Sequence, residues 1–187
     1  KELLVAIASQ KGGVGKSVFT VLLASVLHYR KDVRVAVVDC DSPQHSIALM
    51  RERDMENVMK NDDLKVSLYR QHERIRKPAY PVIKSDPEKG VEDLRRYMDE
   101  KGETFDIVLF DLPGTLRSEG VVHTVAAMDY IFVPLKADNI VMQSSLQFTK
   151  VLEEELIAKG NCNLKGIRLF WNMVDRRGRK NLYDAWN

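Results

Sequence analysis

Cysteine is scarce in this sequence. Only Cys40 and Cys162 occur among 187 residues, far apart and outside any C-x-x-C pair. Such spacing supports neither a disulfide framework nor a cysteine metal site, and it is typical of a reducing compartment. The four histidines show no metal-ligand spacing either.

Long apolar runs and a strong net charge are also missing. No run approaches the ~20 apolar residues that cross a bilayer, and the first residues lack a signal-peptide layout. We therefore expect a cytoplasmic protein with no membrane partner. A net charge of +2 is too small to indicate nucleic-acid binding, so that argument depends on local basic clusters. The length predicts one domain over residues 1–187.

Short apolar runs alternate with helical patterns along the chain. The runs occupy residues 3–8, 33–38, 80–84, 107–110, 130–135 and 166–171. Such alternation predicts a three-layer α/β fold, in which a mostly parallel central sheet carries helices on both faces. Ligands in these folds bind at the carboxyl ends of the strands, where the polar motifs of this sequence fall.

Two helical segments carry specific local predictions. In the first, one face at helical spacing holds Val18, Val21, Leu22, Ser25, Val26 and Tyr29. In the second, Ser42 and Pro43 predict an N-cap and a first helical turn, opening a helix through about Val58. The pattern then weakens over residues 60–77, which hold six lysines and arginines against three acidic residues.

A glycine-rich loop separates the first apolar run from the first helical pattern. From Lys11 it reads Lys-Gly-Gly-Val-Gly-Lys-Ser, and Gln10 occupies the first glycine position of the usual phosphate-loop pattern. The glycines free the backbone, so successive amides face phosphate oxygens at the positive end of the following helix. Lys16 is expected to reach the β- and γ-phosphates, and Ser17 to bind Mg²⁺. The backbone contacts fall on Gly12, Gly13, Val14 and Gly15.

Three aspartates follow apolar strand patterns. Asp111 stands where a Walker B aspartate holds Mg²⁺, and Gly114 completes a D-x-x-G sequence whose amide contacts a γ-phosphate. Asp39 and Asp41 alternate at a strand end, so their side chains face different ways, and Asp41 is the candidate for orienting or deprotonating water. Each aspartate taken alone is equally consistent with a helix cap.

These motifs resemble the three signatures of the ParA/MinD family of deviant Walker ATPases. The resemblance runs from Leu3 to about Asp175, and it rests on the glycine-rich loop together with Asp39-Cys40-Asp41-Ser42-Pro43-Gln44 and Asp111-Leu112-Pro113-Gly114. Within the family, the sequence looks most like the ParA-type proteins of conjugative transposons. Ser42 is an insertion relative to the commonest D-x-D-P-Q form, and relatives continue with further elements beyond the position of Asn172.

The resemblance implies a Mg²⁺-dependent ATP hydrolase that forms a homodimer when ATP is bound. It also implies an activating partner protein and a role in partitioning, positioning or transfer of mobile DNA. Lys11 would be the signature lysine that reaches the partner subunit's nucleotide. Asp41 matches the aspartate associated with hydrolysis, Asp39 the aspartate near the metal, and Asn172 the asparagine that hydrogen-bonds adenine.

Two alternatives remain open from the sequence. A GTPase is suggested by Asp111-x-x-Gly114 and Asn172-x-x-Asp175, although Met173 stands where the second motif usually has lysine. A nucleotide-dependent module that binds non-specific DNA with little catalysis is suggested by two basic segments. These segments are residues 60–77 and 176–180.

Overall fold

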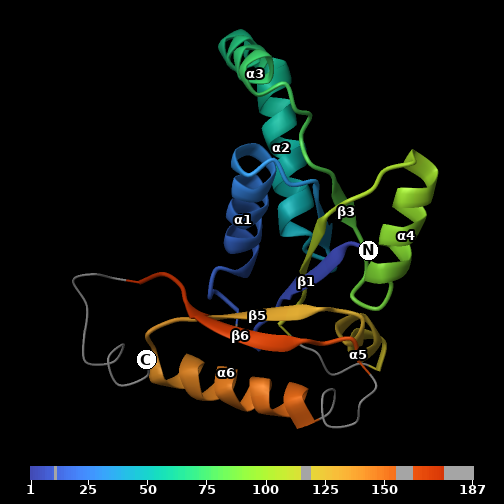
Figure 1. The fold of residues 1–187 in the computed structure, drawn as a ribbon. Helices are drawn as coiled ribbons and strands as arrows, with labels where there is room; N and C mark the ends of the chain where they lie inside the picture. Colours follow the sequence, from blue (N-terminus) through green and yellow to red (C-terminus); the bar gives the residue numbers. More distant parts are fainter. Residues whose placement is uncertain (11, 115–118, 155–161, 175–187) are drawn as a thin grey trace.

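A parallel sheet forms the centre of the molecule (Figure 1). The computed structural model describes residues 1–187 except 11, 115–118, 155–161 and 175–187. The described residues form six strands in the order β3-β2-β4-β1-β5-β6, and every neighbouring pair is parallel. The strands are β1 (Leu3–Ile7), β2 (Val35–Asp39), β3 (Val82–Lys84), β4 (Ile107–Asp111), β5 (Tyr130–Leu135) and β6 (Gly166–Trp171).

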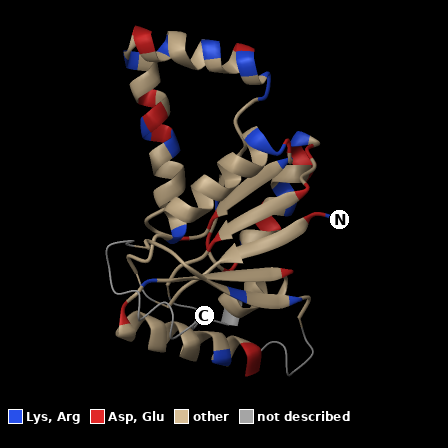
Figure 2. Cartoon of the chain, turned by 60° about the vertical axis from the view of Figure 1, so that its left-hand side comes forward, with Lys and Arg blue, Asp and Glu red and all other residues tan. Residues whose placement is uncertain are grey.

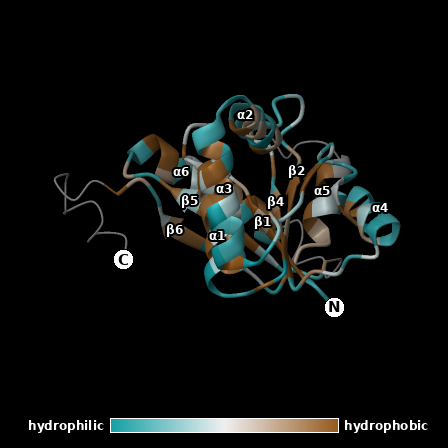
Figure 3. Cartoon of the chain, turned by 90° about the horizontal axis from the view of Figure 1, so that it is seen from above, coloured by the Kyte–Doolittle hydropathy of each residue, from teal (hydrophilic) through white to brown (hydrophobic). Residues whose placement is uncertain are grey.

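Helices cover both faces of this sheet. They are α1 (Lys16–Arg30), α2 (Ser46–Lys60), α3 (Asp62–Ile75), α4 (Gly90–Lys101), α5 (Glu119–Ala126) and α6 (Asn139–Leu152). One core cluster joins the sheet to Ala24 of α1 and Ile47 of α2, and the other joins it to Leu94 of α4 and Phe148 of α6. Figure 3 shows the hydrophobic strands enclosed between the helices. The predicted three-layer α/β fold is confirmed.

The strand register brings the polar motifs to one edge. Asp111 pairs in register with Ile7 of β1 on one side and with Asp39 of β2 on the other. These are the last residues of three adjacent parallel strands, so the loops that follow them all leave from the carboxyl edge of the sheet. The sequence motifs therefore meet where ligands bind in folds of this kind.

The predicted face of α1 is only partly correct: Val21 and Tyr29 pack against the core, but three of its other residues do not. The exposed fractions of Val18, Leu22 and Val26 are 65%, 59% and 41%, whereas Thr20, Ala24 and His28 are buried. Apolar side chains occur almost all around this helix, so hydrophobic spacing alone selects no unique face. Of these buried residues, Ala24 belongs to the core cluster that includes strands of the sheet.

A helical arm occupies the region where the sequence pattern is weakest. Helices α2 and α3 project from the sheet, and α3 lies at the far end (Figure 1). All residues of α3 are described, and none of them is buried. Within the described residues, no helix is long and apolar enough to cross a membrane.

Candidate nucleotide site

The loop between β1 and α1 has the backbone of a phosphate cradle. Gly13 and Gly15 have φ angles of 73° and 82°, which strain any residue with a side chain. Val14 is buried between them, and α1 begins directly afterwards at Lys16. The amides of the loop and the amino end of α1 therefore lie at the carboxyl edge of the sheet. Lys11 lies outside the described residues.

Ser17 and Asp111 meet beneath this loop. The hydroxyl of Ser17 donates a 2.5 Å hydrogen bond to Oδ2 of Asp111. The other oxygen, Oδ1, is buried and has no hydrogen-bond partner among the described residues. Burial raises the pKa of Asp111 to about 6, although the Ser17 hydroxyl and the charge of Lys16 oppose the increase. Asp39 and Asp41 raise this pKa further by repulsion.

This arrangement fits a magnesium ion. Mg²⁺ prefers oxygen ligands and is commonly held by one or two carboxylates together with substrate phosphates. Asp111 supplies a buried carboxylate oxygen without a partner among the described residues, and Ser17 supplies a hydroxyl from the first turn of α1. A divalent cation would also remove the desolvation cost that raises the pKa of Asp111.

Asp39 accepts hydrogen bonds from backbone amides at the start of α2. Its Oδ2 accepts hydrogen bonds of 3.0 Å from the amides of both Ile47 and Ala48, and its Oδ1 accepts one of 3.3 Å from Asp41. The carboxylate therefore caps the amino end of α2. The predicted cap at Ser42 is wrong, because α2 begins at Ser46 and Asp39 satisfies its first amides.

Asp41 differs from Asp39 in both exposure and bonding. It is partly exposed, and its carboxylate accepts no hydrogen bond from the described residues. Its backbone carbonyl accepts a 2.8 Å hydrogen bond from the amide of His45, which fixes the turn before α2. Of the two alternating aspartates, Asp41 has the carboxylate available for water or substrate.

Gly114 lies against the start of the phosphate loop. A Cβ atom at this position would stand 3.5 Å from the backbone oxygens of both Ser9 and Gln10. The D-x-x-G segment and the glycine-rich loop are thus neighbours, as the prediction for Gly114 requires. Residues 115–118, which follow it, lie outside the described residues.

Asn172 reaches the phosphate loop from the far end of the chain. Its Nδ2 donates a 2.8 Å hydrogen bond to the carbonyl of Val14, and its own amide donates to Leu135 on β5. A Cβ atom on Gly15 would lie 2.7 Å from Nδ2 of Asn172 and 3.8 Å from Sδ of Met173. No sequence pattern indicates this tether or the position of Met173 beside the loop, because the partners are 158 residues apart.

Together these features define a P-loop nucleoside triphosphatase. The chain belongs to the family of the ATPase MipZ, whose family model matches residues 3–146. It is a ParA-type ATPase, as its sequence motifs predicted. Its placement among the proteins of conjugative transposons stays a prediction.

Similar proteins agree with this assignment. The chain is 27% identical over 179 residues to the chromosome-partitioning ATPase Soj of Thermus thermophilus, a match that covers 92% of this chain and 70% of Soj. A plasmid partition protein of Borrelia burgdorferi bound to AMPPNP has a TM-score of 0.67 at 22% identity, covering 99% of this chain and 82% of that one. The pNOB8 ParA protein bound to nonspecific DNA has a TM-score of 0.52 at 20% identity, and the match covers 83% of this chain and 62% of that one.

Proposed function

We propose that this chain hydrolyses Mg²⁺-ATP as a nucleotide-switched dimer that partitions, positions or transfers mobile DNA. The observation that carries the proposal is the contact between Ser17 and Asp111, which leaves a buried carboxylate oxygen beside the phosphate loop. We treat residues 1–187 as one ATPase domain.

The residues of the site have separate roles in this proposal. The loop amides and Lys16 hold the phosphates, and Asn172 hydrogen-bonds the adenine while tethering the loop through Val14. Ser17 and Asp111 would hold Mg²⁺, and the bound ion would supply positive charge next to the phosphates. Asp39 positions α2 and contributes negative charge near the metal.

Asp41 is the residue that acts on the attacking water. Its partly exposed carboxylate accepts no hydrogen bond from the described residues and raises the pKa of Asp111 by repulsion, so it lies close enough to influence that carboxylate. Phosphoryl transfer requires a group that orients the nucleophile. In our proposal Asp41 is this group, and Gly114 contacts the γ-phosphate and transmits its loss to the following loop.

Lys11 connects the two subunits in our proposal. It stabilises the nucleotide of the partner subunit, so ATP favours the dimer and ADP the monomer. Sizing by light scattering, with ADP and with ATP, tests this directly. We expect wild type to dimerise with ATP alone, and Lys11→Ala to stay monomeric while still binding nucleotide. A Lys11→Ala variant that dimerises and hydrolyses ATP like wild type refutes the assignment.

Nucleotide choice is tested by thermal unfolding. A ligand that binds only the folded state raises the apparent unfolding temperature. We expect a larger increase with Mg²⁺-ATP than with Mg²⁺-GTP, and no increase with either nucleotide for Lys16→Ala. A larger increase with GTP supports the GTPase alternative.

A further inference from the structure

A histidine in the turn before α2 is attached to the end of β2. Nδ1 of His45 lies 3.2 Å from the carbonyl oxygen of Asp39, the last residue of that strand. A carbonyl oxygen only accepts hydrogen bonds, so Nδ1 carries the proton and donates it. The same oxygen accepts a 3.0 Å hydrogen bond from the amide of Ser85, which follows β3. The sheet therefore fixes the acceptor, and the acceptor fixes the ring of His45.

The ring of His45 does not cap α2. His45 occupies the N-cap position, but its side chain makes no capping hydrogen bond to the first amides of the helix. Oδ2 of Asp39 accepts hydrogen bonds from two of these amides instead. Because the imidazole is bonded to β2 and not to α2, its contact acts on the turn that joins the two elements.

This turn is closed around Asp41. The amide of Asp41 donates a 3.3 Å hydrogen bond to Oδ1 of Asp39, and its carbonyl accepts one of 2.8 Å from the amide of His45. Pro43 and Gln44, which lie inside the turn, are exposed. Core packing therefore does not hold these residues, and the shape of the turn depends on its hydrogen bonds.

The backbone of His45 is left-handed, with a φ of 41° and a ψ of 51°. This conformation is uncommon for residues with a side chain, although Asn, Asp and His adopt it more readily than others. Residues in sparsely populated conformations persist where the surrounding contacts hold them, and they gather at functional sites. In His45 the amide contact to Asp41 and the ring contact to Asp39 hold the same residue. Loss of the ring contact should therefore loosen the turn.

The position of the Asp41 carboxylate follows from this turn. The carboxylate accepts no hydrogen bond from the described residues, so only the backbone of the turn fixes its place. Its charge acts on Asp111, which places it near the proposed metal site. Displacing such a group by about 1 Å can slow a reaction about 100-fold.

We propose that His45 is a positioning residue for hydrolysis, whose ring holds the turn so that the Asp41 carboxylate meets the attacking water. The inference rests on the proposed function for the role of Asp41. The hydrogen bond from His45 to Asp39 is testable without that role. In this proposal the imidazole acts through Asp41 and does not itself contact the nucleotide.

Three variants separate the ring contact from the backbone conformation. His45→Gly removes the ring and adopts the left-handed conformation without strain. His45→Asn also tolerates this conformation, and its Nδ2 takes the place of Nδ1, so it keeps a donor for Asp39. Arg76→Gly is the matched control, because Arg76 has a φ of 50° but ends α3, on the arm that projects from the sheet (Figure 2).

Steady-state phosphate release with Mg²⁺-ATP is the first measurement. We expect His45→Gly to lower kcat about tenfold or more while KM stays within about twofold of wild type. His45→Asn should keep kcat within about threefold, and Arg76→Gly within about twofold, of wild type. A wild-type kcat in His45→Gly, an equal loss in His45→Asn, or a change confined to KM overturns the inference.

Nuclear magnetic resonance tests the contact without turnover. Long-range proton–nitrogen spectra of the neutral ring should place the proton of His45 on Nδ1, because donation to Asp39 selects that tautomer. Hydrogen exchange at the amide of Asp41 should be faster in His45→Gly and close to wild type in His45→Asn. A proton on Nε2, or exchange at Asp41 that His45→Gly leaves unchanged, overturns the inference whatever the activity.

Failure of the proposed function gives a different result. Wild type that binds Mg²⁺-ATP without hydrolysing it, or Asp41→Ala with normal turnover, rejects the role of Asp41. The tautomer and exchange measurements then confirm or overturn the contact of His45 separately. A low kcat in His45→Gly beside normal turnover in Asp41→Ala overturns the inference, because His45 would then act through another residue.

Discussion

The hydroxyl of Ser17 donates a 2.5 Å hydrogen bond to Asp111, 94 residues further along the chain. The contact joins the first turn of α1 to the end of β4, the strand beside β1 in the sheet. It leaves one oxygen of Asp111 buried without a partner among the described residues. A carboxylate in that position is costly for the folded protein until a cation binds.

Asp111→Asn should stabilise the protein when metal and nucleotide are absent. The pKa of Asp111 is raised from 3.8 to about 6 by burial, so folded protein binds the proton more tightly than unfolded protein. Wild-type stability therefore falls as pH rises through about 4 to 6, by an amount on the order of 2–3 kcal/mol. Urea unfolding in EDTA should show the variant more stable above pH ~6, with the advantage shrinking toward pH ~4.

Magnesium and ATP should reverse that order. Wild type should gain stability from Mg²⁺-ATP, whereas Asp111→Asn should gain much less because it lacks the carboxylate ligand. Equal stabilisation of the two proteins by Mg²⁺-ATP would show that Asp111 is not part of the metal site.

Gly15→Ala and Gly12→Ala should differ in their effect on the folded protein. Gly15 has a φ of 82°, and its added Cβ would lie 2.7 Å from Nδ2 of Asn172. We expect an unfolding temperature about 4 °C lower or more, from a backbone cost of about 1–2 kcal/mol plus the displaced amide. Nothing described lies within 4 Å of a Cβ at Gly12, so that variant is the control. Equal unfolding temperatures for the two variants contradict the close approach of Asn172 to the phosphate loop.

Asp39→Ala and Asp41→Ala should separate stability from hydrolysis. Removing the Asp39 carboxylate exposes two amides at the start of α2 and should cost about 1–2 kcal/mol in chemical unfolding. Asp41→Ala should change stability by no more than about 0.5 kcal/mol, because its side chain caps nothing in the described structure. It should nevertheless abolish turnover and retain ATP binding. Normal turnover in Asp41→Ala rules out its proposed role.

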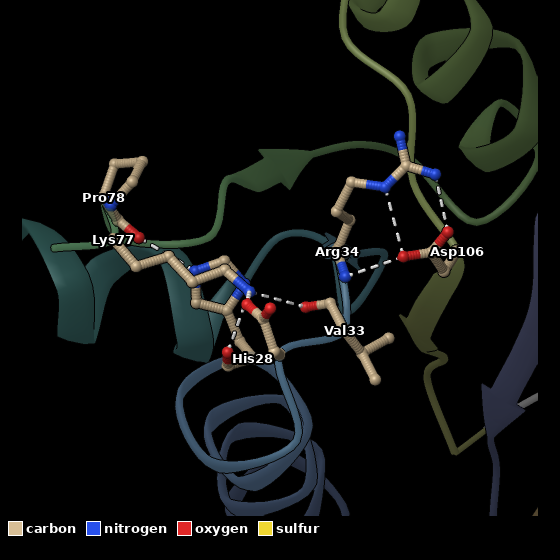
Figure 4. A network of polar contacts seen from close by, with 7 residues as sticks. His28, Val33, Arg34, Lys77, Pro78 and Asp106 are labelled. Atoms are coloured by element: carbon tan, nitrogen blue, oxygen red, sulfur yellow. Dashed lines mark hydrogen bonds and ion pairs between the residues drawn. The ribbon is translucent and has the colours of Figure 1, made fainter. Parts of the chain in front are cut away.

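Asp106→Asn should weaken the protein most clearly near neutral pH. Hydrogen bonds from the side chain and amide of Arg34 lower the pKa of Asp106 to about 2 (Figure 4). The folded pKa lies below the unfolded one, so this stabilisation is present above about pH 4 and disappears as pH falls toward 2. Both side chains are about half exposed, so we expect no more than about 1 kcal/mol. A difference from wild type that persists unchanged at low pH would show that the ionised Asp106 carboxylate is not the source of the stabilisation.

The sequence predicts the sheet and the position of the site because both depend on local patterns. Buried strands read as apolar runs, and the strand ends place Asp39 and Asp111 at one edge. The cap on α2 could not be predicted, because Asp39 accepts hydrogen bonds from the amides of Ile47 and Ala48, which are eight and nine residues away and outside any local capping pattern. The buried face of α1 could not be predicted in full, because apolar residues occur on several sides of the helix.

Long-range contacts set the remaining limit on sequence-based prediction. The sequence predicts Asn172 as a nucleotide-binding residue, but its bond to Val14 joins residues from opposite ends of the chain. The hydrogen bonds from Nζ of Lys77 to the carbonyls of His28 and Val33 are likewise hidden, because these partners lie at and just after the end of α1. Such contacts follow from the folded arrangement of elements, and no spacing within one segment encodes them.

Whether this chain hydrolyses ATP is measured by phosphate release in the presence of Mg²⁺. We expect turnover by wild type, none by Lys16→Ala, which loses nucleotide binding, and none by Asp41→Ala, which retains it. Turnover by purified Lys16→Ala at the wild-type rate, or stable binding of ATP by wild type with no hydrolysis under any condition that permits dimerisation, would contradict this expectation.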